Sequence, residues 1–452
     1  MTIDRRAFLQ GCGAAALGAM AAPVSRAGSS QEEARLPNPA QSGIEHVVVV
    51  LMENRSFDHL LGWMPEADGK QAGLLYADKS GVVHSTHWLA PDYTGCGHPD
   101  PDHSYGPGRV AYNHGAMDGF LKAGNNDVYA IGFYTEGDIP FYSSLAQTYM
   151  TCDRWFASIL GPTFPNRMFL WAAQTDRLDD NVGLSHLPTI FDALSHHGVS
   201  HRYYFNNVPY VALWGLKYLF STSTFATFLS DAASGRLPAV SFVDPSFTVL
   251  DDGTGNDDHP HADIRNGDAF LWKIFNALST GPKWPNTVLL ILFDEWGGFF
   301  EHVAPPRVTA PNNIDTDLVN GAALLGFRVP AVIASPFTFG RGVNHAVYDH
   351  TAALKLIEWR WSLPALTARD ASAAISNPVS SFNFDSPTTR VPNLPRVNPV
   401  FAAPCFGGGI FNSSAREVSV AGKRNEFTPL ANASTTQEFL EHPHIRAQAL
   451  AR

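Results

Sequence analysis

The chain has 452 residues, of which 45% are hydrophobic, and a formal net charge of −11 at pH 7. This apolar content is enough for a large core, and the length allows one large domain or two or three smaller ones. Nucleic acids and anionic bilayers reward basic surfaces, so the negative balance argues against either of them as the main partner. A locally positive pocket that holds a metal ion is compatible with this balance.

The N-terminus has the features of an export signal. Arg5 and Arg6 precede a weakly apolar run over 11–22, and Ser25 and Ala27 supply the small residues that signal peptidase requires. The segment resembles a twin-arginine signal cleaved after Ala27, which predicts the twin-arginine translocation machinery as a partner and a periplasmic or secreted mature protein. No other apolar run is long enough to span a bilayer, so we expect no transmembrane segment.

Three cysteines remain after such a cleavage, namely Cys96, Cys152 and Cys405. An odd number in an exported protein predicts one disulfide and one free thiol, and the sequence does not select the pair.

The first predicted strand ends at a polar cluster. The apolar run over 47–52 is typical of a strand buried on both faces of a parallel sheet, and Glu53 and Asn54 follow it directly. Ligands bind at the carboxyl ends of such strands, and a carboxylate beside an amide oxygen suits a hard divalent cation. In the alternative interpretation, Glu53 and Asn54 cap the next helix and Arg55 pairs with Asp58.

A long irregular segment follows, over 62–110, which is rich in Gly, Pro, Asp and His. Loops of this length inside a compact domain are functional or disordered. His98 or His103 could reach back over the strand ends to contact phosphate or metal, and the alternative is a solvated loop histidine.

Thr163 is a candidate functional residue at the start of a predicted helix. After a short helix over 141–150, the string 161–167 leads into an apolar run, and Pro165 is typical of a first helical turn. Thr163 would lie at or just before this N-terminus, where backbone N–H groups and the helix dipole favour an anion. The alternative is that Thr163 is only a cap or turn residue.

Acids and imidazoles are also concentrated in residues 256–264, which include His259 and His261. The alternative for this stretch is an acidic surface turn that caps the following helix. The other predicted elements are helices over 189–197, 268–278, 348–361 and 436–449, strands over 237–245 and 329–335, and a wrapping segment over 371–404.

A second apolar strand, over 287–293, ends at Asp294 and Glu295. If it lies beside the first strand and parallel to it, three carboxylates and one amide oxygen meet at one point. Carboxylates that close repel each other unless a cation neutralises them. Gly297 and Gly298 allow the backbone to turn sharply there.

Taken in this order, the motifs resemble those of the bacterial phospholipase C and acid phosphatase family, a branch of the alkaline phosphatase superfamily. The resemblance implies a three-layer α/β/α sandwich with a mostly parallel central sheet, alkaline-phosphatase-like, in which residues 28–452 form a single catalytic domain. The matching motifs are those at 53–59, 103–104, 117–120, 161–167, 258–260, 294–302 and 349–351.

The resemblance also implies roles for individual residues. It makes Thr163 the nucleophile and His103 and His259 contacts of the phosphoryl or leaving group. The divalent metal would be calcium, magnesium, manganese or iron, held by Glu53, Asn54, Asp294 and Glu295. Asn166 and Arg167 are expected to stabilise charge on the phosphoryl oxygens, whereas His261, His302 and His350 receive no definite role.

The expected reaction is phosphoryl transfer through a phosphothreonine. The string at 163–167 is similar to the sulfatase string Cys-x-Pro-Ser-Arg, but threonine cannot replace the oxidised cysteine or serine of sulfatases, which favours phosphate esters. We expect a phospholipase C that cleaves phospholipid to diacylglycerol and a phosphoalcohol. The alternatives are an acid phosphatase acting on soluble monoesters and a secreted binding protein without activity.

Overall fold

An eight-stranded sheet forms the centre of the computed structural model, which describes residues 36–248 and 253–405. The strand order is β14-β6-β13-β10-β1-β9-β7-β8. The strands are β1 (His46–Met52), β6 (Met150–Cys152), β7 (His201–Phe205), β8 (Thr222–Thr224), β9 (Val240–Val243), β10 (Thr287–Phe293), β13 (Ala331–Ala334) and β14 (Val343–Asn344).

The sheet is mostly parallel. β1 pairs in parallel with β10 on one side and with β9 on the other, and only β13 among these eight strands runs antiparallel to its neighbours. β1 and β10 are buried along their whole length, which explains why both sequences are apolar without alternation. The predicted α/β class and mostly parallel sheet are confirmed.

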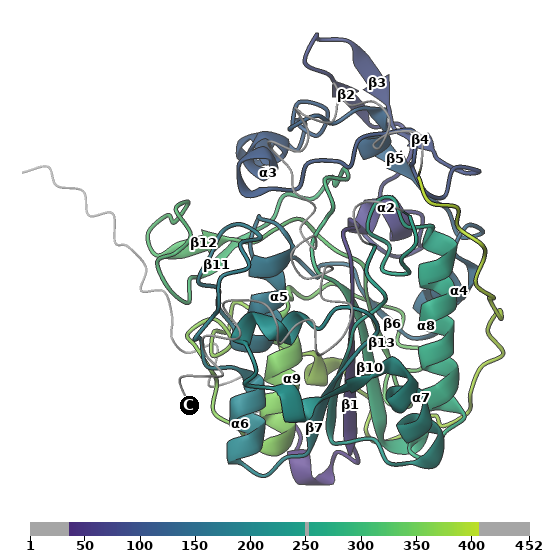
Figure 1. Ribbon diagram of the computed structural model, residues 1–452, viewed down its shortest axis with the longest axis vertical. Helices are drawn as coiled ribbons and strands as arrows, with labels where there is room; N and C mark the ends of the chain where they lie inside the picture. Colours follow the sequence, from purple (N-terminus) through teal and green to yellow (C-terminus); the bar gives the residue numbers. More distant parts are fainter. Residues whose placement is uncertain (1–35, 249–252, 406–452) are drawn as a thin grey trace, which may run out of the picture. The chain divides into compact units, whose positions relative to one another are not determined.

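Helices cover both faces of the sheet, as Figure 1 shows. On one side lie α4 (Pro140–Thr148), α7 (Phe225–Ser234) and α8 (Ile264–Ser279), and on the other lie α5 (Thr163–Ala172), α6 (Ile190–His196) and α9 (Thr351–Trp361). The chain thus forms the expected three layers. Among the described residues, none of the helices is both long and apolar enough to cross a membrane.

Most predicted elements are confirmed with shifted ends. The helix predicted over 268–278 begins at Ile264, because Asp263 caps it by accepting from the N–H of Arg265. The helix predicted over 141–150 ends at Thr148, and Met150 already belongs to β6. The signal peptide and the helix predicted over 436–449 lie outside the described residues.

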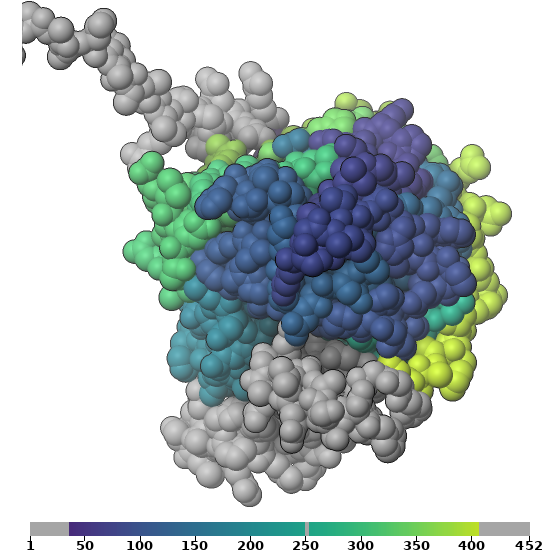
Figure 2. Space-filling view, turned by 90° about the horizontal axis from the view of Figure 1, so that it is seen from above, coloured from purple at the N-terminus to yellow at the C-terminus, as the bar shows by residue number. Residues whose placement is uncertain are grey.

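The segment over 62–110 and its continuation form a separate layer beyond the carboxyl ends of the strands (Figure 1). It contains the hairpin β2 (Leu75–Ala77) and β3 (Val83–Ser85), the pair β4 (His87–Trp88) and β5 (Gly132–Phe133), and α3 (Tyr105–Tyr112). Figure 2 looks down on this face, where purple and blue atoms from this early part of the chain predominate. Apart from short 3₁₀ turns, the remaining elements are α2 (Phe57–Leu61), β11 (Arg307–Thr309) and β12 (Ala322–Leu324).

The wrapping segment is attached to this layer by a disulfide. Cys405 bonds to Cys96, and Cys152 is a buried free thiol, so the expected disulfide and free thiol are both present. Residues 390–405, yellow-green in Figure 1, run beside α8 toward β4 and β5. Of the described part of this segment, only Pro378–Ser381 is helical, as a single 3₁₀ turn.

Candidate active site

The register of β1 and β10 brings Glu53, Asn54 and Asp294 together. The Glu295 carboxylate turns toward His103 and toward the N–H of Gly297, from which it accepts at 2.8 Å. Met52 is the partner of Phe293, so the residues that follow the two strands leave the sheet side by side. The N–H of Asn54 donates to Asp294 Oδ1 at 3.0 Å. Gly297 is required here, because a Cβ at this position would lie 2.0 Å from the carbonyl oxygen of Asn54.

The alternative interpretation of this stretch, as helix caps, is wrong. Ser56, not Glu53 or Asn54, caps α2 by accepting from the N–H of His59. Arg55 donates to the carbonyl of Asp258 at 2.7 Å. Glu53, Asn54, Asp294 and Glu295 are all completely buried, which a capping role would not require.

Thr163 is the first residue of α5, and its side chain lies among the predicted metal ligands. Its Oγ1 atom lies 3.3 Å from Glu53 Oε2 and 3.3 Å from Asn54 Oδ1. Pro162 occupies the N-cap position, so Thr163 is not the helix cap. The N–H of Phe164, in the first turn of α5, donates to Asp180 Oδ1 at 2.7 Å. This N–H is therefore not available to bind a substrate anion.

Asn166 lies one helical turn into α5 and holds the loop before it. Its Nδ2 donates to the carbonyls of Gly161 at 2.8 Å and Pro162 at 3.0 Å, and its Oδ1 accepts from the N–H of Ile159. These contacts fix the loop that leads into Thr163. The contact with phosphoryl oxygens expected for Asn166 stays a prediction.

Arg167 balances part of the negative charge at the site. Its Nε donates to Glu53 Oε1 at 2.8 Å, its Nη1 donates to Asp244 Oδ1 at 3.0 Å, and Asp294 Oδ2 lies 3.6 Å from Nε. Burial alone would lower the pKa of Arg167, but the neighbouring carboxylates outweigh it and raise this pKa well above its usual value. Burial raises the pKa of Asp244.

The donor set fits a hard divalent cation. Glu53, Asp294 and Glu295 supply buried carboxylates, and Asn54 and Thr163 supply oxygens next to Glu53. Arg167 contributes one positive charge, which leaves an excess of buried negative charge in this group. Oxygen ligands of this kind suit calcium, magnesium, manganese or ferrous iron.

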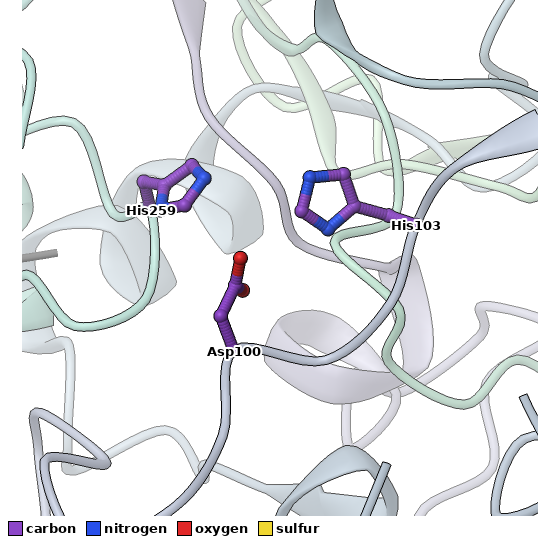
Figure 3. Close-up of side chains that lie close together, drawn as sticks. All are labelled: Asp100, His103 and His259. Atoms are coloured by element: carbon purple, nitrogen blue, oxygen red, sulfur yellow. The ribbon is translucent and has the colours of Figure 1, made fainter. Parts of the chain in front are cut away.

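His103 and His259 lie on either side of the Asp100 carboxylate, as Figure 3 shows. Their rings lie 5.8 Å apart at an angle of 82°. His103 Nε2 lies 3.2 Å from Asn54 Nδ2, and His103 Nδ1 lies 2.8 Å from the carbonyl oxygen of Pro101. His103 Nε2 is also 3.9 Å from Glu295 Oε1, so this imidazole borders the predicted metal ligands directly.

Asp100 is a site residue that the sequence analysis missed. Its carboxylate points between the two imidazoles in Figure 3, and one ligand atom from each of Asp100, His103 and His259 lies within 4.8 Å of the others. Asp100 and Asp102 lie two residues apart in the sequence, and nothing in the pattern indicates which of them joins the site. Asp102 instead accepts from the N–H and hydroxyl of Ser104 before α3.

The three unassigned histidines have different surroundings. His350 Nε2 lies 2.6 Å from the carbonyl of Asp294, and burial lowers the pKa of His350 to about 4, so it is neutral and fixes the end of β10. His302 contacts Asp58 at 2.6 Å in a buried group that also holds Glu301 and Arg328, two acids against one guanidinium. Burial alone would lower the pKa of His302, but the two carboxylates outweigh it and raise this pKa. Burial lowers the pKa of His261.

Comparison with known proteins identifies the family. The Phosphoesterase family model matches residues 44–364. The chain is 34% identical over 406 residues to non-specific phospholipase C6 of Arabidopsis thaliana, covering 80% of this chain and 77% of that protein. It is 31% identical over 477 residues to phospholipase C B of Mycobacterium tuberculosis, covering 87% and 88%.

Among solved structures, a member of the alkaline phosphatase superfamily from Vibrio parahaemolyticus is similar with a TM-score of 0.38 and 12% identity, covering 75% of this chain and 71% of that chain. From the family match and the sequence relatives, the chain is a phosphoric ester hydrolase. It belongs to the phosphoesterase family, which confirms the family and the enzyme class predicted from the sequence.

Proposed function

We propose that this chain is a metal-dependent phospholipase C that cleaves a phospholipid such as phosphatidylcholine to diacylglycerol and a phosphoalcohol. The observation that carries the proposal is the buried Thr163 hydroxyl, 3.3 Å from both Glu53 and Asn54 at the start of α5. The names of the relatives, phospholipases C from a plant and a bacterium, support the substrate class.

Glu53, Asn54, Asp294 and Glu295 would hold the cation, which when bound lowers the pKa of nearby hydroxyls and offsets negative charge on phosphoryl oxygens. The Thr163 hydroxyl passes its proton to Glu53, to whose Oε2 it donates at 3.3 Å, and Oγ1 attacks phosphorus in line. The bond from phosphorus to the diacylglycerol oxygen breaks, and His103 or His259 donates a proton to that oxygen. Water then attacks phosphorus and gives one proton to the histidine, the bond from phosphorus to Thr163 Oγ1 breaks, Oγ1 takes back the proton from Glu53, and the phosphoalcohol is released.

Paired hydrolysis of p-nitrophenyl phosphorylcholine and p-nitrophenyl phosphate tests the proposal. We expect preference for the diester, loss on chelation with recovery on adding metal, and at least about a thousand-fold loss in Thr163→Ala. Thr163→Ser, which keeps a hydroxyl, is the matched control and should retain measurable turnover. Full activity in Thr163→Ala would exclude the nucleophile, and preference for the monoester would identify an acid phosphatase.

We also propose that the chain is exported through the twin-arginine pathway and that residues 28–452 act as one catalytic domain. The Cys96–Cys405 disulfide supports an oxidising compartment. Replacing Arg5 and Arg6 by lysine should leave the chain uncleaved in the cytoplasm, as cell fractionation would show. Unchanged export of this variant would count against the pathway.

A further inference from the structure

The outward face of the β2–β3 hairpin carries two exposed aliphatic side chains, where a solvent-exposed strand usually carries polar ones. Leu75 and Val83 have exposed fractions of 65% and 59%, and Val82, just before β3, is 53% exposed. Single exposed apolar residues are common, but a group of them on one short hairpin marks an interaction surface. The hairpin surface is defined here as Leu75 and Val83, which share this face through the pairing of the strands, whereas Val82 points to the other face.

The hairpin is held in place by its inner face and its turn. Leu75 pairs with Ser85 and Ala77 with Val83, so the side chain of Tyr76 points to the opposite face. Tyr76 is only 3% exposed and packs edge-on against Phe120, with ring centroids 5.7 Å apart. Tyr76 therefore anchors the hairpin from the inner face, while the hairpin surface is presented on the outside.

The turn between the two strands is also ordered by specific contacts. Asp78 Oδ1 accepts from the N–H groups of Ser80 at 2.8 Å and Val82 at 3.0 Å. A rigid apolar tip loses little conformational entropy when it is buried against a partner.

The hairpin surface lies at the same end of the molecule as the candidate active site. β2, β3 and β4 are beyond the carboxyl ends of β1 and β10 in Figure 1. Tyr76 also contacts the ring of Phe300, with centroids 6.2 Å apart, and Phe300 follows Glu295 by five residues in the sequence. The same irregular segment carries Asp100 and His103.

Trp88 adds an amphipathic side chain just after the hairpin. Its ring is 57% exposed, while its Nε1 donates to Asp138 Oδ2 at 2.8 Å. Tryptophan with an anchored polar end and an exposed ring is the residue type enriched at membrane–water interfaces.

We propose that the hairpin surface, with Trp88, inserts into the outer leaflet of a zwitterionic phospholipid bilayer and docks the enzyme there. The inference deepens the proposed function, since a phospholipid must leave its bilayer to reach a site at this end of the sheet. The formal charge of −11 disfavours anionic membranes, and Asp78 and Lys79 beside the hairpin surface balance each other. Insertion of apolar side chains therefore provides the attraction, and binding should be insensitive to salt.

The test compares Leu75→Glu/Val83→Glu with Phe220→Glu. Phe220 is 97% exposed, but it lies in the turn Leu219–Ser221 that leads into β8, at the amino ends of the parallel strands. Binding to phosphatidylcholine vesicles is measured by flotation, with Thr163→Ala added to every chain to prevent hydrolysis. We expect the double variant to bind about ten- to a hundred-fold more weakly and Phe220→Glu to bind as the parent does.

Turnover of p-nitrophenyl phosphorylcholine by the same variants, with Thr163 intact, reports whether the fold and site survive. We expect it to stay within about two-fold of the parent, while turnover of vesicle phosphatidylcholine falls with binding. The proposal would be overturned if the double variant bound vesicles as well as the parent does. It would also be overturned if the parent bound only anionic vesicles, or if the hairpin surface mediated self-association of the chain instead. Because flotation needs no turnover, failure of the proposed activity would not be mistaken for failure of docking.

Discussion

Arg167 and Thr163 contact opposite oxygens of the Glu53 carboxylate. Arg167 Nε donates to Oε1 at 2.8 Å, and Thr163 Oγ1 lies 3.3 Å from Oε2. The two residues are four apart on α5, so they share one face of the helix, one turn from each other. The helix therefore sets the position of the hydroxyl relative to the carboxylate, and Arg167 holds that carboxylate in place.

Replacing Arg167 by methionine should destabilise the protein strongly. The change leaves Glu53 and Asp244 buried without their guanidinium, and breaking a buried ion pair from one side costs about 3–5 kcal/mol. The melting temperature and the rate of turnover should both fall, and added divalent metal should restore part of the lost stability. Lys283→Met, which breaks the exposed pair with Glu45, is the control and should cost less than about 1 kcal/mol. Equal losses in the two variants would contradict this role.

The sequence was sufficient to predict the strand ends and the position of Thr163, because both follow from local patterns. Apolar runs ended by acids identify β1 and β10, and Pro165 marks the start of α5. That β1 and β10 pair in parallel, which the sequence alone left as a condition, then places Glu53 and Asp294 side by side.

The ion pair between Arg167 and Asp244 and the hydrogen bonds of Asn166 could not be predicted from local patterns. Asp244 reaches Arg167 from the end of β9, 77 residues away, and only the packing of α5 on the sheet makes this contact. Both polar atoms of the Asn166 side chain bond to the preceding loop, which a motif resemblance does not reveal. Asp100 joins the site because its irregular segment folds back over the strands.

Asp100→Asn should lower turnover by about ten- to a hundred-fold without unfolding the protein, because it removes the carboxylate between His103 and His259. The loss should be larger for alkyl esters, whose leaving oxygen needs a proton, than for p-nitrophenyl esters. Asp127→Asn breaks a similar contact with His98 in the same layer, at 2.8 Å, and should leave both rates nearly unchanged. Equal losses on both kinds of ester would argue against a role in proton transfer.

Removing the disulfide should lower stability more than any single surface change. Cys96 and Cys405 are 309 residues apart, and cross-links that close long loops stabilise proteins by about 2–5 kcal/mol. Cys96→Ser/Cys405→Ser should melt at a lower temperature and should not respond to a reductant. Cys152→Ala should keep the sensitivity to reductant that the parent shows, because its thiol is not bonded. Equal melting temperatures for the oxidised and reduced parent would contradict this prediction.

Asp268 makes the stability of the protein depend on pH. It accepts from the N–H groups of Phe141 at 3.1 Å and Tyr142 at 2.7 Å at the start of α4, and burial raises its pKa to about 7. The folded protein therefore binds this proton more tightly than the unfolded chain. The contribution of protonated Asp268 to the free energy of unfolding is therefore complete below the ordinary carboxyl pKa near 3.8, and it is lost as the pH rises through about 7.

Asp268→Asn removes this titration, since the amide carries no charge at any of these pH values. The variant should gain stability relative to the parent between about pH 4 and pH 7, by about 1.4 kcal/mol for each unit of the pKa difference, and the gain should level off above that range. Urea unfolding of both proteins at several pH values measures the difference. Asp231→Asn, an acid on α7 that accepts from the hydroxyl of Tyr204, serves as the control. Parallel stability curves for Asp268→Asn and the parent would show that this carboxyl is ionised in the folded protein throughout the range.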